Sequence, residues 1–240
     1  MVKNKFLEIL SLFFIATYFS VGGVVEGKVI LKGVPPSDVI IPSAKTKDCH
    51  DGEIKTEFWK VATNGGLAEV VVWIEGVDKK AKPTHASEVL TINQQGCRYV
   101  PHVSAVRVKE KVKIKNSDAT LHNARGSQFV KNRKGRIIFN LAQPSQGMVS
   151  EVFFPETGLY SLECDVHPWM QAWVMALESP FFAVTDSEGY FRLPFGVPPG
   201  EYEIKAWHSR FLDPLSQKIK VTDQTNEVKF EFMLKAATVQ

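Results

Sequence analysis

Three residues whose side chains bind soft metal ions lie at three-residue intervals in one short segment. Cys164 ends residues 158–164, which read as a strand, and His167 and Met170 follow it. A thiolate, an imidazole and a thioether are the ligand set that suits copper, and Cu(I) in particular. A mononuclear blue-copper site needs one cysteine and two histidines in a trigonal plane, with a weak axial methionine. The segment therefore predicts most of such a site, with one histidine to come from elsewhere.

His122 is the candidate for that missing histidine. Residues 111–115 alternate apolar and lysine side chains, which is the period-two pattern of a half-buried strand. A polar turn over residues 116–120 follows and is expected to present His122 in a loop. In a β-sandwich, a histidine at this position can lie close to a loop near the end of the domain, such as the one that carries Cys164, His167 and Met170.

The two segments together resemble the cupredoxin family, most closely its amicyanin and plastocyanin type. In that family the first ligand sits in a His-Asn pair after a strand and a polar turn, here His122 and Asn123. The family's Gly-x-Tyr-x-Tyr/Leu-x-Cys strand is matched by residues 158–164, and the resemblance covers about residues 87–178. It implies that Asn123 ties the two ligand loops together. It also implies one type 1 copper site with four ligands: His122, Cys164, His167 and Met170.

Three residues depart from the family pattern. Val166 replaces a proline that is common before the second histidine, and Arg125 stands where an apolar residue often follows the His-Asn pair. Asp165 lies beside the ligand cysteine, where a carboxylate would stabilise the oxidised, more positive site. These departures bear on the reduction potential more than on copper binding.

Other chemistries fit this loop less well. Zinc accepts cysteine and histidine but seldom methionine. A binuclear copper site needs two cysteines in the loop, and only Cys164 is there. A Cys-His protease would need a helix N-terminus or a similar device to lower the thiol pKa, and an oxyanion hole. The remaining alternative is structural: a buried cysteine, a solvated histidine and a core methionine.

Cys49 and Cys97 are the other two cysteines of the chain. The simplest interpretation is a disulfide, which would close a loop of about 48 residues and contribute roughly 3–4 kcal/mol by the chain-entropy model. Two alternatives stay open: one of the two thiols is free, or Cys97 and His102 belong to a second metal site. His208 follows a tryptophan at a strand end and is expected to pack or to hydrogen-bond rather than to bind a metal.

The N-terminus reads as an export signal over residues 1–23. Lys3 and Lys5 precede a mostly apolar run, and Ser20 and Gly22 are small residues at plausible positions for cleavage. An uncleaved membrane anchor is the alternative. No other stretch is long and apolar enough to span a bilayer, so we expect no membrane span after signal cleavage. The expected location is the periplasm or another extracytoplasmic (secreted) space, where disulfides are permitted.

The composition excludes several classes of protein. The chain has 240 residues, with 44% hydrophobic and 23% charged residues, which is ordinary globular usage. Its 29 Lys and Arg against 26 Asp and Glu give a formal net charge of +3, too weak to suggest nucleic-acid binding. Three cysteines exclude a disulfide-dense small scaffold.

Short strands separated by Gly, Pro and Asn turns predict an all-β protein. Residues 181–207 resemble the carboxypeptidase regulatory-like (transthyretin-like) β-sandwich family through Thr-Asp-x-x-Gly-x-Phe-x-Leu and then Val-Pro-Pro-Gly-x-Tyr. That family's usual first strand, a Gly-x-Val pattern, occurs instead at residues 27–29. We therefore predict a Greek-key cupredoxin sandwich inserted into a second, small β-sandwich; three sequential modules are the alternative. The predicted segments are a signal peptide at 1–23, an N-terminal β segment at 24–86, a cupredoxin domain at 87–178 and a carboxypeptidase regulatory-like domain at 179–240.

The resemblance implies an exported blue copper protein that carries single electrons between redox partners and is not an enzyme. A protein redox partner is expected to dock on an apolar patch near Trp169, around an exposed His167. The basic turn at residues 131–136 could steer an acidic partner or be a solvated hairpin tip. Two alternatives remain. One is a structural or assembly subunit of a larger extracytoplasmic complex in which copper is dispensable, and the other is a copper-delivery protein.

Overall fold

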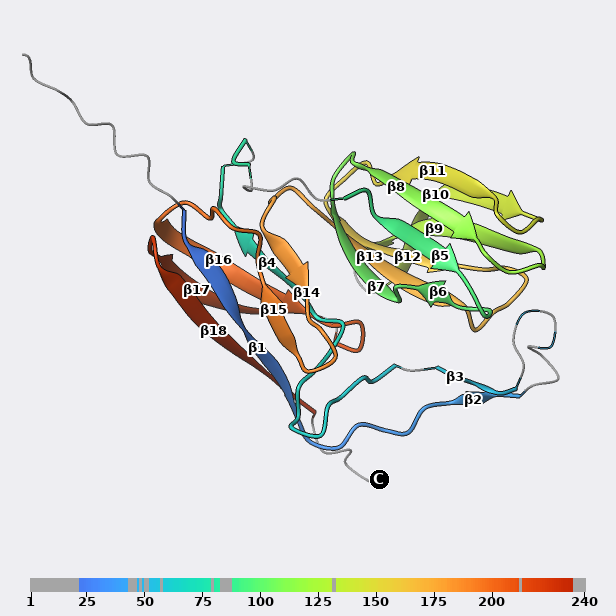
Figure 1. Ribbon diagram of the computed structural model, residues 1–240, viewed down its shortest axis with the longest axis horizontal. Coiled ribbons are helices and arrows are strands. Elements are labelled where there is room, and N and C mark those ends of the chain that lie inside the picture. The colour runs from blue at the N-terminus through green and yellow to red at the C-terminus, as the bar shows by residue number, and fades with distance from the viewer. Residues whose placement is uncertain are drawn as a thin grey trace, which may run out of the picture.

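The computed structural model describes residues 22–42, 47, 49, 52–56, 58–78, 80–82, 88–130, 133–211 and 213–234 (Figure 1). The predicted signal at 1–23 falls almost wholly outside these residues, as does the start of the basic turn at 131–136. Every regular element in the described ranges is a β-strand, which confirms the all-β prediction. Within the same ranges no helix has the length and apolar character needed to cross a membrane.

Two β-sandwiches lie side by side (Figure 1). The first sandwich has a three-stranded sheet in the order β15-β1-β18 and a four-stranded sheet in the order β14-β4-β16-β17. Its strands are β1 (Val24–Lys32), β4 (Val71–Glu75), β14 (Phe182–Val184), β15 (Tyr190–Arg192), β16 (Gly200–Trp207), β17 (Leu215–Val221) and β18 (Thr225–Met233).

The first sandwich is built from strands of the N-terminal and the C-terminal parts of the chain. Strand β1 pairs in parallel with β18, where Val29 lies opposite Phe230, and antiparallel with β15. Strand β4 pairs with β14 and β16. The second sandwich lies between β4 and β14 in the sequence, so these pairings confirm the predicted insertion. The predicted boundary at residue 86 lies outside the described residues, and the domain limits stay predictions.

The second sandwich has a five-stranded sheet in the order β10-β9-β12-β13-β7 and a four-stranded sheet in the order β11-β8-β5-β6. Ile92 and Ile114 from the smaller sheet share one core with Leu162 and Val174 from the larger one. Its strands are β5 (Thr91–Gln94), β6 (Tyr99–Val100), β7 (Val103–Arg107), β8 (Lys111–Asn116), β9 (His122–Val130), β10 (Arg133–Gln143), β11 (Val149–Phe153), β12 (Gly158–Glu163) and β13 (Gln171–Leu177).

Strand β4 is buried on both faces, as its unbroken apolar run predicts. Val72 and Ile74 belong to the core of the first sandwich. Val71 and Trp73 point the other way and pack in a separate cluster with residues of the second sandwich, among them Val103, Met175 and Leu177. The two sandwiches are therefore joined by a continuous apolar contact as well as by the chain.

A long excursion, here called the ribbon, leaves the first sandwich after β1 and returns before β4 (Figure 1). It contains β2 (Ile40–Ile41) and β3 (Ile54–Lys55), which pair antiparallel. Ile54 is buried in the core of the second sandwich with Cys97 and Tyr99. The ribbon therefore belongs in part to the second sandwich, which the polar character of residues 43–57 does not predict.

Candidate metal centre

Three of the four predicted ligands converge at one end of the second sandwich. The Nδ1 atoms of His122 and His167 lie 3.0 Å apart. The Sγ atom of Cys164 lies 3.9 Å from Nδ1 of His122 and 3.7 Å from Nδ1 of His167. One thiol sulfur and two imidazole nitrogens thus face a common point, which is the donor set that the sequence predicts.

Neighbouring strands bring these residues together. Strands β9 and β12 pair antiparallel with Glu163 opposite Arg125, so the start of β9 and the end of β12 lie at the same end of the sheet. Cys164 directly follows β12. His122 is the first residue of β9 rather than part of a loop, so its backbone is fixed by the sheet and the predicted loop position is wrong.

His167 and Met170 lie in the tight turn between β12 and β13. The amide of Met170 donates to the carbonyl of His167 at 2.9 Å, and the amide of Cys164 donates to the carbonyl of Met170 at 3.3 Å. Met170 is 2% exposed and packs in the same core as Cys164. The turn therefore holds all three residues in one compact unit, and the axial role of the Met170 sulfur stays a prediction.

The cluster is shielded from water. The exposed fractions are 0% for His122, 2% for Cys164 and 6% for His167. The expectation that His167 is exposed is therefore wrong. The Trp169 ring lies 5.2 Å from the His167 ring, centre to centre, and the sulfurs of Cys49 and Cys97 lie within 4.8 Å of a ring nitrogen of His167.

Asp118 supports His122 and was not predicted from the sequence. Its Oδ2 atom lies 2.8 Å from Nε2 of His122, so the imidazole is held with its Nδ1 atom toward Cys164. The same carboxylate accepts the backbone N–H groups of Gly96 at 2.7 Å and Cys97 at 3.0 Å. Carboxylates on the far nitrogen of a ligand histidine commonly fix its tautomer and orientation. The only sequence signal is the spacing of four residues between Asp118 and His122 across a polar turn.

Asn123 ties the two ligand-bearing segments together, as the family resemblance implies. Its backbone N–H donates to the Cys164 sulfur at 3.5 Å. Its side chain accepts the amide N–H of Asp165 at 2.6 Å and donates to the Asp165 carboxylate at 3.1 Å. The thiol is therefore oriented from the neighbouring strand.

The unusual charges beside Cys164 compensate one another. Arg125 contacts Asp165 through Nε and Glu163 through a terminal nitrogen, each at 2.9 Å. Lys134 contacts Glu163 at 2.6 Å. Asp165 therefore does not act on the site as an isolated negative charge, and the two departures from the family pattern, Arg125 and Asp165, form one ion pair.

The pKa values of the cluster reflect this packing. Burial raises the pKa of the Cys164 thiol, but the hydrogen bonds from His122 and from the backbone amide of Asn123 outweigh burial, and the net pKa is lowered. Burial lowers the pKa of His122, and its hydrogen bonds with Cys164 and Asp118 more than reverse this, so the net pKa is raised. The lowered pKa of Cys164 is a shift toward the thiolate, which is the form that binds metal.

The separations of the donor atoms fit a single metal ion. With metal–nitrogen bonds of about 2.0 Å and metal–sulfur bonds of about 2.3 Å, three ligands in a plane lie roughly 3.5–3.7 Å apart. The two sulfur–nitrogen distances, 3.7 and 3.9 Å, are close to this, and the nitrogen–nitrogen distance of 3.0 Å is somewhat shorter. Softness of the donors favours copper over harder ions.

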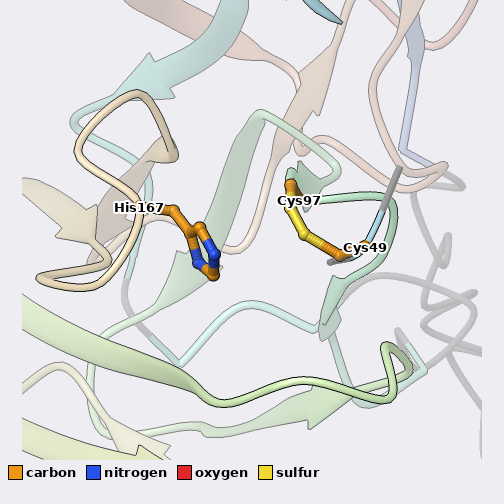
Figure 2. A group of neighbouring side chains, drawn as sticks. All are labelled: Cys49, Cys97 and His167. Atoms are coloured by element: carbon orange, nitrogen blue, oxygen red, sulfur yellow. A yellow bond between two sulfur atoms is a disulfide. The ribbon is translucent and has the colours of Figure 1, made fainter. Parts of the chain in front are cut away.

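The other two cysteines form the predicted disulfide. Cys49 and Cys97 are bonded, and their Cα atoms lie 5.5 Å apart. The alternative metal site at Cys97 and His102 is not formed, because Cys97 is in the disulfide and Nδ1 of His102 lies 2.8 Å from Glu69. Figure 2 shows the His167 ring projecting from its loop toward the side on which the disulfide lies.

Comparisons with known proteins complete the description. No protein-family model and no curated protein matches the chain. A purple cupredoxin from Nitrosopumilus maritimus is 24% identical, with a TM-score of 0.31, and the alignment covers 37% of this chain and 99% of the cupredoxin. An amicyanin from Paracoccus versutus is 17% identical, with a TM-score of 0.31, over 44% of this chain and 97% of the amicyanin. A copper-containing nitrite reductase from Thermus scotoductus is 19% identical, with a TM-score of 0.31, over 42% of this chain and 26% of the reductase.

Proposed function

We propose that this protein binds one type 1 copper ion and carries single electrons between redox partners. The observation that carries the proposal is the convergence of the Cys164 sulfur with Nδ1 of His122 and His167 in a buried cluster. Met170, held in the same turn, would supply the weak axial thioether. A bound copper ion would supply the redox couple, alternating between Cu(I) and Cu(II).

The protein's own residues hold the proposed copper ligands in fixed positions. Asp118 fixes the His122 ring, the Asn123 amide fixes the Cys164 sulfur, and the hydrogen bonds of the turn fix His167. Because few of these groups can move, the ligand positions would change little between the two oxidation states. A small geometric change on electron transfer is what a carrier requires.

We infer that the site does not turn over a small-molecule substrate. The four proposed donors would fill the positions around the metal, and each of them is at most 6% exposed. A substrate would therefore have no open coordination position on the metal. Electrons would enter and leave through the protein shell instead.

A redox partner is proposed to dock near Trp169. His167 itself is buried, but Pro168 beside it is exposed and Trp169 is half-buried. The Trp169 ring lies next to the His167 ring, so it bridges a proposed ligand and the surface. The disulfide supports the proposed periplasmic or other extracytoplasmic location, since such bonds persist in oxidising compartments.

The first sandwich is proposed to be a binding or structural module of the carboxypeptidase regulatory-like kind. The motif that suggests it, residues 185–193, lies at the hairpin that leads into β15. The Thr185 hydroxyl donates to the carbonyl of Leu67 and accepts the amide N–H of Val70, so this residue locks the hairpin to the segment before β4. No catalytic role is proposed for this sandwich.

The test is optical. The oxidised, copper-loaded protein should absorb intensely in the visible range through charge transfer from thiolate to copper, and Cys164→Ser should abolish the band. A matched control removes the other two sulfurs, Cys49→Ala with Cys97→Ala, and should keep it. Copper bound to the native chain without such a band would reject the type 1 assignment. A Cys164→Ser protein that still supports full electron flow would favour the structural or assembly role.

A further inference from the structure

A second group of metal-binding side chains lies beside the proposed copper centre. The sulfurs of Cys49 and Cys97 and one ring nitrogen of His167 all lie within 4.8 Å of one another (Figure 2). In the disulfide form the two sulfurs bind each other. We propose that reduction of this disulfide opens a second Cu(I) site, formed by the Cys49 and Cys97 thiolates and by the imidazole of His167, the residue that it shares with the proposed type 1 site. This goes beyond the proposed function, because it concerns a site that exists only after reduction.

The two cysteines differ in accessibility. Cys97 is fully buried, while Cys49 is half-buried on the ribbon. An incoming thiolate therefore attacks the Cys49 sulfur, and the Cys97 thiolate leaves. With a dithiol as reductant, the reaction forms one disulfide in the reductant and two thiols here, so two electrons and two protons are transferred. Binding of Cu(I) then displaces the two thiol protons.

The backbone keeps the two sulfurs close after the bond is broken. The Cys97 amide donates to Asp118, and the Cys97 carbonyl accepts the indole N–H of Trp169 at 3.2 Å. On the ribbon, β3 anchors the chain near Cys49 by burying Ile54 in the core of the second sandwich. The Cα atoms of the two cysteines are only 5.5 Å apart, so both thiolates can reach one ion.

The chemistry of the group selects the metal. Two thiolates with one imidazole form a soft, three-coordinate set, which suits Cu(I), whereas structural zinc almost always takes four ligands. A cavity of about 390 Å³ lies beside the group and is lined by Cys97, Trp169 and Met170. The cavity therefore reaches one of the two cysteines, Cys97.

Cu(I) binding to the full chain in competition with a chromophoric Cu(I) chelator tests the proposal. The variant Cys164→Ala removes the thiolate of the proposed type 1 site, and Cys164→Ser serves if the alanine variant does not fold. We expect the disulfide form to bind no Cu(I) against the chelator and the phosphine-reduced form to bind one ion per chain. Equal binding by the two forms would overturn the proposal.

The contribution of His167 needs its own measurement, because any pair of thiols binds Cu(I) to some extent. Adding His167→Gln to the reduced variant should weaken Cu(I) binding by about tenfold or more, since losing even a residue that supports a metal ligand costs this much. X-ray absorption should show two sulfurs and one nitrogen before this change and two sulfurs after it. His102→Gln, a change at a neighbouring histidine paired with Glu69, is the matched control. Unchanged affinity and coordination on loss of His167 would refute the site; the visible band of the untreated native protein tests the proposed function separately.

Discussion

The Asp118 carboxylate links His122 to the disulfide: it lies 2.8 Å from Nε2 of the imidazole and accepts the Cys97 amide at 3.0 Å. Asp118 therefore contacts both a candidate copper ligand and the backbone of one cysteine of the disulfide. The contact to Cys97 is made by its backbone amide, so it does not require the cysteine side chain.

Replacement of Asp118 by asparagine should weaken copper binding by roughly 10–100-fold, because the imidazole loses the carboxylate that fixes its orientation. Copper affinity and the position of the visible band measure the effect. Asp223→Asn, an exposed carboxylate in the turn before β18, is the control and should leave both unchanged. An Asp118→Asn protein with native affinity and spectrum would show that Asp118 is not a support of the site.

Replacement of Arg125 by glutamine should lower the reduction potential. The side chain pairs with Asp165 and with Glu163, and Glu163 also contacts Lys134. Loss of Arg125 therefore adds net negative charge near Cys164, chiefly at Asp165, and this charge stabilises the more positive, oxidised site. Redox titration of the visible band measures the shift. The reverse change, Asp165→Asn, should raise the potential; shifts of the same sign in both variants would contradict this electrostatic account.

Replacement of Met170 by leucine should keep the visible band but raise the potential, since an apolar side chain in place of a weak thioether donor favours the less charged Cu(I) state. Met175→Leu is a matched control in the same sandwich, because Met175 packs against the first sandwich rather than in the ligand turn. If both methionine variants leave the potential unchanged, Met170 is a core residue and not an axial ligand.

Removal of the disulfide by Cys49→Ala with Cys97→Ala should lower the free energy of unfolding by roughly 3–4 kcal/mol, because the unfolded chain regains the freedom of a loop of about 48 residues. Denaturant titration of the native and variant chains measures the loss. A loss below about 1 kcal/mol would mean that the ribbon is held mainly by packing at Ile54 and not by the covalent bond.

His208 should make the protein less stable at acidic pH. It is 1% exposed and stacked on Trp59 at 5.2 Å, and burial lowers its pKa to about 4, with smaller opposing and reinforcing effects from Glu69, His102 and Arg210. In the unfolded chain the pKa is near 6.5, so between pH 6.5 and 4 the unfolded state binds more protons and stability falls as the pH falls.

The expected size of this effect is about 3 kcal/mol between pH 7 and pH 4. Unfolding titrations across this range measure it, and His208→Phe should lose this part of the pH dependence while other groups continue to titrate. A native and a variant chain with parallel pH profiles would show that His208 is not buried as a neutral ring.

The sequence predicted the parts of the site that depend on local spacing. Cys164, His167 and Met170 share one turn, so their separation in the sequence largely determines their proximity in space. The burial of His167 could not be predicted in this way, because residues far away in the sequence, among them Cys49 and Cys97, lie beside its ring. The role of Asp118 depends on how the turn before β9 folds, which the residue types alone do not specify.

The same distinction holds for the fold. The alternation at Val112 and Ile114 and the apolar run around Val72 predicted strands β8 and β4 and their burial. Strands β2 and β3 have two residues each and lie in a polar segment, so they are too short for an alternation of apolar and polar residues to predict them. Their pairing is stabilised by distant contacts, above all the burial of Ile54 against Cys97 and Tyr99.

The ribbon adds an attachment between the two sandwiches through the buried Ile54 and the Cys49–Cys97 disulfide. The second sandwich is attached to the first by the chain after β4, by the chain before β14 and by the ribbon with its disulfide, and the apolar cluster around Trp73 fills the contact between them. Among the described residues, these connections and the apolar contact hold the two sandwiches together at several points. A protein bound to the first sandwich would then lie at a set distance and angle from the candidate metal centre, so in the proposed function the first sandwich would fix the distance of electron transfer.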